Sequence, residues 1–418
     1  MGSAHGALAA SMQEIQDAQA AAQAQAAAQQ GPGEGPCHCC DSRRVLGDLE
    51  CPFTWAVPPM GPEEAAYAED KMFMWAEPYV AAADKIALAY SRHCEGRHWE
   101  ARAHLVECYM FLMAADVPSS AWPRRCEVYD VYRDGFRHVV DACWAGMCLP
   151  ERSEYHTGRH VRRADSPDTS VQDFIKTIKP FNRLHRRQQA AALTLKSRFM
   201  TDEGLEKLLR HCLRLDPKEG AWKHLLGWSL QDQRGKLSTM MQTDDGKVMT
   251  MLKGADGKVK VVEGWAKTEP SYEEVALLRD AYRQRPNPDT MTRLAKTLLE
   301  SKKFFEEGKR LLDDALTLHP KCPAVLYQAL NIYPSIQVPW ALEEEMYLRT
   351  LELTKDHAHI YVKLGMRYMS MGKQALANPL FAQGLTKNRL AAQAFLEVMK
   401  GTVSASKDTC AEYSAQQK

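Results

Sequence analysis

The strongest constraint on the fold is a pattern of small and bulky residues near the end of the chain, in the stretch IYVKLGMRYMSMGKQALANPLFAQGL (residues 360–385). The residues of this pattern are Tyr361, Leu364, Gly365, Tyr368, Gly372, Ala377, Phe381 and Gly384. Small residues let two antiparallel helices approach closely, and aromatic residues fill the space between successive helix pairs. The pattern therefore predicts two packed helices with a turn at Gly372, and it indicates packing rather than catalysis.

The same pattern recurs upstream at repeat-length intervals. Ala295 and Ala329 are 34 residues apart, and Ala329 and Gly365 are 36 apart. The less regular units place Leu226, Gly227, Leu294, Ala295, Gly308, Ala315 and Pro320 at corresponding positions. Intervals of this length are typical of a solenoid of helix pairs, in which each pair contacts its neighbours.

These residues resemble the motif of the tetratricopeptide-repeat family over about residues 185–400, with degenerate pairs extending to about residue 65. The long, irregular pairs look like those of the interferon-induced tetratricopeptide-repeat proteins. The resemblance implies an all-α fold, a right-handed superhelix of antiparallel helix pairs, and a non-enzymatic scaffold that binds a peptide or partner helix in its concave groove. Pro379 departs from the motif because it lies inside a helix, where proline produces a kink.

In several repeats, a leucine is followed directly by a small residue, and we call these two residues a Leu-small pair. The residues next to each such pair are expected to face the groove. These residues are Trp228, Arg293, Lys296 and Lys363. A cationic groove favours an acidic or carboxylate-ended peptide, although exposed Lys and Arg are also common on ordinary solvated helix faces. Chaperone-binding members of the family clamp a carboxylate with two Asn residues. Lys296, Met366 and Trp228 stand at those places here, which argues against a standard clamp.

A basic segment offers an alternative function. Residues 152–198 contain eleven Lys and Arg against four acidic residues, and the interferon-induced relatives are RNA-binding proteins of innate immunity. The candidate RNA-binding residues are Arg159, Arg162, Arg163, Arg183, Arg186 and Arg187. Such a run can contact phosphates, but no aromatic residues alternate with these charges to stack bases. A solvated linker and helix face explain the same composition.

The segment over residues 235–270 has a different pattern. It contains two Asp-Gly-Lys turns next to two runs of apolar and β-branched residues, which are Val248, Thr250 and Leu252 in the first and Val259, Val261 and Val262 in the second. Such turns between alternating residues predict a β-hairpin inserted between paired helices. An insertion of this kind either carries a binding function or is a tolerated surface extension.

The first part of the chain is rich in Ala and Gln and ends in Gly and Pro, which predicts a disordered or weakly helical tail. Cys37, Cys40 and Cys51 are weak candidates for zinc ligands, because the second C-x-x-C pair that usually completes a tetrahedral site is missing. After the tail, apolar periodicity predicts two helices around a turn at CEGRH (residues 94–98) and a third helix over about residues 124–144.

The sequence thus divides into five parts. They are a tail over 1–61, degenerate helical repeats over 62–150, a basic polar linker over 151–179, repeats over 180–400 with the insertion at 235–270, and a polar tail over 401–418.

Bulk properties exclude several function classes. The net charge of +1 predicts no whole-chain attraction to nucleic acid or to a membrane. The chain shows no signal peptide pattern and no apolar run of the ~18 residues that a membrane span needs, so we expect a cytoplasmic protein with reduced cysteines. It also lacks phosphate-loop, nucleophile-elbow and H-E-x-x-H patterns, which argues against an enzyme and against a cofactor.

Overall fold

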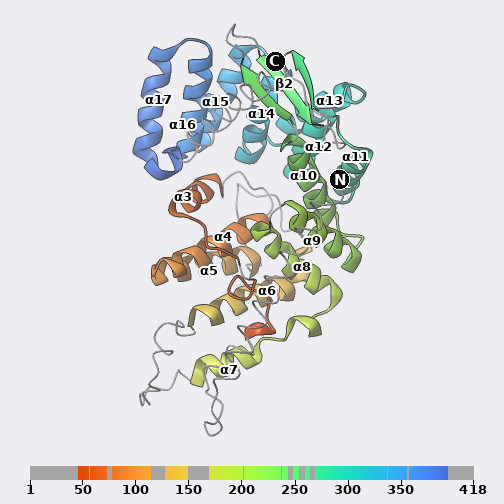
Figure 1. The fold of residues 1–418 in the computed structure, drawn as a ribbon, viewed down its shortest axis with the longest axis vertical. Helices are drawn as coiled ribbons and strands as arrows, with labels where there is room; N and C mark the ends of the chain where they lie inside the picture. Colours follow the sequence, from red (N-terminus) through yellow and green to blue (C-terminus); the bar gives the residue numbers. More distant parts are fainter. Residues whose placement is uncertain are drawn as a thin grey trace, which may run out of the picture.

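The computed structural model describes residues 46–393 except for positions 56, 73–77, 114–127, 149–168, 201, 237, 243–247, 254–258, 264–268, 337 and 355–356. Within these residues the chain forms a succession of helices with one small sheet (Figure 1). The N-terminal helices are α3 (Pro62–Lys71), α4 (Pro78–Cys94), α5 (His98–Met113), α6 (Val128–Cys148) and α7 (Thr169–Thr177).

The second half of the chain consists of helices that pair in antiparallel fashion. They are α8 (Arg186–Lys196), α9 (Asp202–Leu215), α10 (Gly220–Lys236), α11 (Tyr272–Gln284), α12 (Pro288–Leu299), α13 (Phe305–Leu318), α14 (Pro323–Ile336), α15 (Trp340–Leu353), α16 (Ala358–Ser370) and α17 (Gln374–Lys387). Successive helices contact one another, and α12 also contacts α10 and α14. The predicted helical-repeat fold is therefore present.

The glycines of the repeat pattern lie where two helices approach most closely. A Cβ atom built on Gly365 of α16 would stand 2.7 Å from the Cε1 atom of Phe381 on α17. On α13, a Cβ atom at Gly308 would stand 2.7 Å from the backbone nitrogen of Leu299 on α12. Real side chains do not tolerate such distances, so these contacts confirm that small residues set the spacing within the pairs.

Two of the six hydrophobic clusters among the described residues are large. The first extends from residues 46–55 through α4, α6 and α8 to α10, and includes the fully buried Phe136 and Trp222. The second lies among α12 to α17, where Leu330, Tyr347 and Ile360 are buried. Helices such as α9 and α12 contribute the apolar faces that the periodicity of the sequence predicts.

The N-terminal half differs in three places from the expected layout. Leu46, Leu49 and Trp55 are buried in the first core, so the part of the predicted tail at residues 46–55 belongs to the folded protein. The helix expected before the CEGRH turn is two helices, α3 and α4. Within the predicted linker, α7 is helical and Ile175 is buried, because the segment carries an apolar face toward α6.

The insertion between α10 and α11 contains three strands rather than the two of a single hairpin. They are β1 (Ser238–Gln242), β2 (Val248–Lys253) and β3 (Val259–Glu263), and they pair antiparallel in the order β1-β2-β3. Met240 lies opposite Thr250, and Thr250 lies opposite Val262. The two Asp-Gly-Lys turns predicted at 245–247 and 256–258 lie outside the described residues.

Candidate functional site

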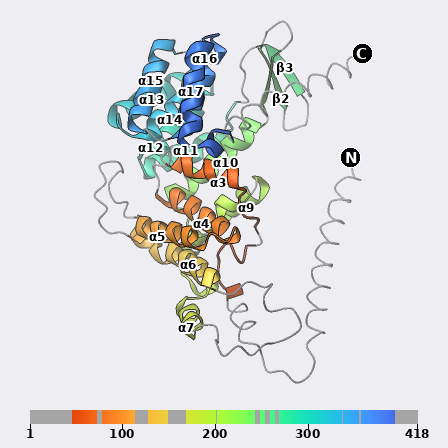
Figure 2. The ribbon, with the colours of Figure 1, turned by 90° about the vertical axis from the view of Figure 1, so that its left-hand side faces the viewer.

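Helix α3 joins the two ends of the helical array, because it lies between α4 and α16 (Figures 1 and 2). The Asp70 carboxylate accepts hydrogen bonds from the backbone N–H groups of Ala358 (2.9 Å) and His359 (3.0 Å) at the start of α16. The Nδ1–H group of His359 donates to the same carboxylate. Burial raises the pKa of Asp70, but these bonds lower it overall, so an ionised Asp70 caps a helix 288 residues away.

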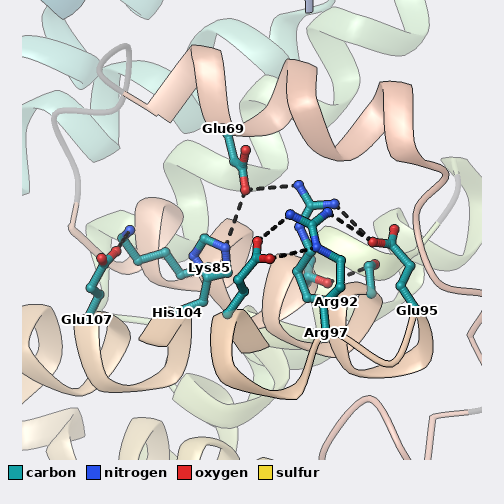
Figure 3. Close-up of polar contacts among 10 residues, drawn as sticks. Glu69, Lys85, Arg92, Glu95, Arg97, His104 and Glu107 are labelled. Atoms are coloured by element: carbon teal, nitrogen blue, oxygen red, sulfur yellow. Dashed lines mark hydrogen bonds and ion pairs between the residues drawn. The ribbon is translucent and has the colours of Figure 1, made fainter. Parts of the chain in front are cut away.

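A second set of polar contacts fixes α3 on its other side (Figure 3). Glu69 accepts a hydrogen bond from Arg92 of α4 at 3.1 Å, and it lies 3.3 Å from Nε2 of His104 on α5. Burial raises the pKa of Glu69, but the bonds from His104 and Arg92 lower it overall. Arg92 also donates to Glu95 at 3.1 Å, so one chain of charges links three helices.

Three cations each lie over an aromatic ring, and the residues of these three pairs come from α3, α10, α12, α14 and α16. Nζ of Lys71 is 3.8 Å from the Tyr67 ring centroid, Cζ of Arg293 is 4.3 Å from that of Trp228, and Nζ of Lys363 is 4.7 Å from that of Tyr327. We call these six residues and Lys296, seven residues in all, the inner cluster. Such pairs combine charge with a flat apolar face.

Contacts through shared neighbours show that the three pairs form one region. The ring of His359 lies 6.5 Å from that of Tyr67 and 5.3 Å from that of Tyr327. Burial lowers the pKa values of both Lys71 and Arg293, and the carboxylate of Asp232 on α10 opposes this shift in each, so Asp232 lies near both. Helix α3 therefore brings its own pair to the pairs of the repeat helices.

Two lysines of the inner cluster, Lys71 and Lys363, have pKa values below the ordinary range of lysine. Burial, and then the neighbouring Arg198, lower the pKa of Lys71 to about 8. Burial lowers the pKa of Lys363 to about 7, with a further contribution from Lys296, although Glu343 opposes it. A lysine whose pKa falls in this way lies where a bound anion would restore its charge.

Other cations of the same helices are paired with carboxylates. Arg234 donates to Glu274 at 2.9 Å and 3.0 Å, and Arg285 donates to Glu219 at 3.0 Å. Farther along the array, Arg367 donates to Glu343 at 2.7 Å and 2.8 Å. These three arginines are therefore satisfied by carboxylates of the protein itself.

The structure brings together the four residues predicted to line the groove. Trp228 and Arg293 touch, and the charge of Lys296 acts on Lys363. Arg293 is 9% exposed, so it does not belong to a solvated helix face. That these residues bind a partner stays a prediction.

Sequence reasoning missed Tyr67, Lys71, His224 and Tyr327. Tyr327 stands two residues before the small Ala329, and a search of that whole helix face would have found it. Tyr67 and Lys71 gave no such signal, because α3 reaches the repeats only through its long-range contact with α16.

The basic residues proposed for RNA binding fall into two groups. Arg159, Arg162 and Arg163 lie outside the described residues. Arg183 and Arg186 are exposed beside the start of α8, and Nε of the exposed Arg187 is 3.5 Å from Asp216. The described three, Arg183, Arg186 and Arg187, lie in the first half of the fold, around the start of α8.

Cys51 does not have the character of a zinc ligand, since its thiol is fully buried and burial raises its pKa to about 12. Cys37 and Cys40 lie outside the described residues. Across the described parts of the chain, His, Cys, Asp and Glu nowhere gather in threes suited to a metal ion. In the same parts, the helices are too short or too polar to cross a bilayer.

No protein-family model matches the sequence, and no curated protein matches it. Solved structures do share its fold. The human IFIT1 dimer with m7Gppp-AAAA aligns with 16% identity and a TM-score of 0.54, covering 84% of this chain and 70% of that chain. The human IFIT1 dimer with PPP-AAAA aligns with 16% identity and a TM-score of 0.53, covering 88% and 75%.

A monomeric IFIT1 mutant with Gppp-AAAA gives 16% identity and a TM-score of 0.55, covering 88% of this chain and 77% of that chain. IFIT1 is an interferon-induced protein with tetratricopeptide repeats. The expected distant similarity to such proteins is confirmed, and at this level of identity it shows the fold.

Proposed function

We propose that this chain, which has the helical-repeat fold of the interferon-induced tetratricopeptide-repeat proteins, binds single-stranded RNA by its phosphorylated 5′ end at the inner cluster. The observation that carries the proposal is the pairing of cations with aromatic rings in Lys71–Tyr67, Arg293–Trp228 and Lys363–Tyr327. Single-stranded RNA presents phosphates to the cations and base faces to the rings.

The structural neighbours support this choice of ligand. IFIT1 structures of the same fold hold PPP-AAAA and m7Gppp-AAAA, which are short RNAs with a 5′ triphosphate or cap. Because the whole chain has a net charge of only +1, long-range attraction to RNA is weak, and binding has to depend on local cations.

The test is a binding titration of the full chain with two RNAs of one sequence, one with a 5′ triphosphate and one with a 5′ hydroxyl. We expect the triphosphate RNA to bind more tightly, with an affinity that falls steeply with salt. Arg293→Gln and Lys363→Met are each expected to weaken binding about tenfold or more. Arg310→Gln, at an exposed position of α13, is the matched control.

Two results would overturn the proposal. The first is equal affinity of wild type, Arg293→Gln and Lys363→Met for the triphosphate RNA. The second is a loss of binding in a double variant of Arg186 and Arg187 while the inner-cluster variants bind normally. That second result would place RNA on the basic surface beside α8 instead.

A peptide ligand is the second candidate, and the ion pairs of the repeat helices favour it. Arg234, Arg285 and Arg367 are already neutralised by carboxylates, so the faces around the inner cluster carry less free charge than a long polyanion would use. An acidic or carboxylate-ended peptide needs fewer cations. Capture of such a peptide by wild type but not by Lys363→Met, without RNA binding, would favour a protein-binding scaffold.

A further inference from the structure

Arg293 is a buried cation whose guanidinium donates to a side-chain amide. Its guanidinium donates to Oε1 of Gln231 at 3.1 Å and lies over the ring of Trp228, and no ion pair to it is found among the described residues. Gln231 is itself held by donating to Oγ1 of Thr297 at 2.7 Å. A buried guanidinium normally has a carboxylate or another anion beside it.

The imidazole of His224, one helical turn before Trp228 on α10, is a second buried polar side chain beside the ring of Trp228. It is 3% exposed, and neither ring nitrogen has a hydrogen-bond partner in the described parts of the chain. Its ring stacks on that of Trp228, with centroids 6.5 Å apart and an interplanar angle of 29°. Buried polar atoms without partners are rare, which points to a ligand or water.

Burial, with a smaller contribution from charged neighbours, decides the protonation state of this imidazole. Burial, followed by the charges of Arg293 and Arg285, lowers the pKa of His224 to about 3. The charges that act on Arg293 are those of Asp232, Asp289 and Glu300. At neutral pH, His224 is therefore an uncharged ring with one N–H donor and one nitrogen that accepts.

We propose that His224, Arg293 and Trp228 form a subsite for a terminal phosphate group that carries a proton. Arg293 supplies the positive charge, one ring nitrogen of His224 donates to a phosphate oxygen, and the other accepts from the phosphate O–H group. This inference rests on the proposed function, because it names the group bound at the Trp228 end of the inner cluster.

The accepting nitrogen makes the subsite selective. Sulfate has the same shape as phosphate but offers no O–H group at neutral pH, so it would leave a buried acceptor of His224 unpaired. Sites that lose one buried hydrogen bond in this way discriminate by about tenfold or more. The subsite therefore distinguishes two anions that charge and size alone do not separate.

The test compares inorganic phosphate with sulfate by calorimetric titration of the full chain at about pH 6 and equal ionic strength. Wild type is expected to bind phosphate at least about tenfold more tightly than sulfate. His224→Phe, which keeps an aromatic ring, is expected to lose this preference, and Arg293→Met is expected to bind neither anion. Arg310→Gln is expected to behave as wild type, and circular dichroism confirms folding of each variant.

Equal binding of the two anions by wild type, or binding of neither, would overturn the subsite. Methyl phosphate, a monoester, loses its last O–H proton at about pH 6, unlike inorganic phosphate, so the preference for it over sulfate is expected to shrink at about pH 8, and this measurement needs no variant. An undiminished preference at that pH would contradict the role of His224. Phosphate selectivity without RNA binding would overturn the proposed function alone, whereas RNA binding without the selectivity would overturn only this subsite.

Discussion

Burial of the Lys363 side chain disfavours its charged form. Its ammonium group donates to Oδ1 of Asn331 and lies over Tyr327, and burial lowers its pKa to about 7. In an unfolded chain a lysine titrates near ~10.4. Between these two values the unfolded chain holds more protons than the folded protein.

This difference predicts that stability rises with pH. Since the unfolded state binds the additional proton, the free energy of unfolding increases as pH rises above 7, and Lys71, with a pKa of about 8, acts in the same direction. Urea unfolding at pH values from 6.5 to 9.5 measures the effect. Lys363→Met is expected to flatten the rise, and Lys309→Met, at an exposed position, is not. An unchanged slope in Lys363→Met would contradict this account.

Single residues also show how far the sequence could predict the site. The repeat register placed Trp228, Arg293, Lys296 and Lys363 on inward faces, because a residue's position relative to its Leu-small pair is a local property. Whether each side chain is solvated depends on other helices. The burial of Arg293 could therefore not be predicted from the sequence around it.

In the pair formed by α16 and α17, the two helices approach each other closely at a residue without a side chain. Gly365 on α16 faces the ring of Phe381 on α17, and the chain pairs these helices because no Cβ atom stands between them. The sequence predicted this pair well, since all its positions lie within 26 residues of one another (360–385).

Replacing this glycine is expected to separate the helices. Gly365→Val should lower the free energy of unfolding by about 1–3 kcal/mol, because the new side chain overpacks against Phe381. Gly235→Ala is the control, since its Cβ atom meets nothing within 4 Å and it lies in the last turn of α10. It should stabilise the protein by about 0.5–1 kcal/mol. Equal effects of the two changes in urea unfolding would argue against packing as the cause.

The insertion was predicted less completely than the helices. Its two Asp-Gly-Lys turns and its two runs of apolar and β-branched residues identified β2 and β3. Strand β1, with the sequence STMMQ, contains only one β-branched residue and no alternating apolar pattern, so no local signal marked it.

At the scale of the whole molecule, the contact between α3 and α16 has no trace in the local sequence. Asp70 and His359 are separated by 289 positions, and a short Ala-rich helix such as α3 resembles many surface helices. Only the completed superhelix brings the two together. For this reason the α3 half of the inner cluster could not be predicted from the repeats.

Removing the Asp70 carboxylate is expected to release the start of α16. Asp70→Ala should cost about 1–3 kcal/mol of unfolding free energy, because two backbone N–H groups and His359 lose their acceptor. Hydrogen exchange should show faster exchange at the amides of Ala358 and His359. Glu63→Ala, at an exposed position of the same helix, should change neither measurement. Unaltered protection of these amides in Asp70→Ala would disprove the capping role.

The same cap limits how this architecture can vary. Open arrays of repeats gain or lose a unit at little cost, because each unit needs only its neighbours. Here the carboxylate on α3 must meet the first turn of α16, so one more or one fewer helix pair would carry that turn out of reach. The length of the array between these two helices is therefore set by ring closure, and the two ends should unfold together rather than fray one repeat at a time.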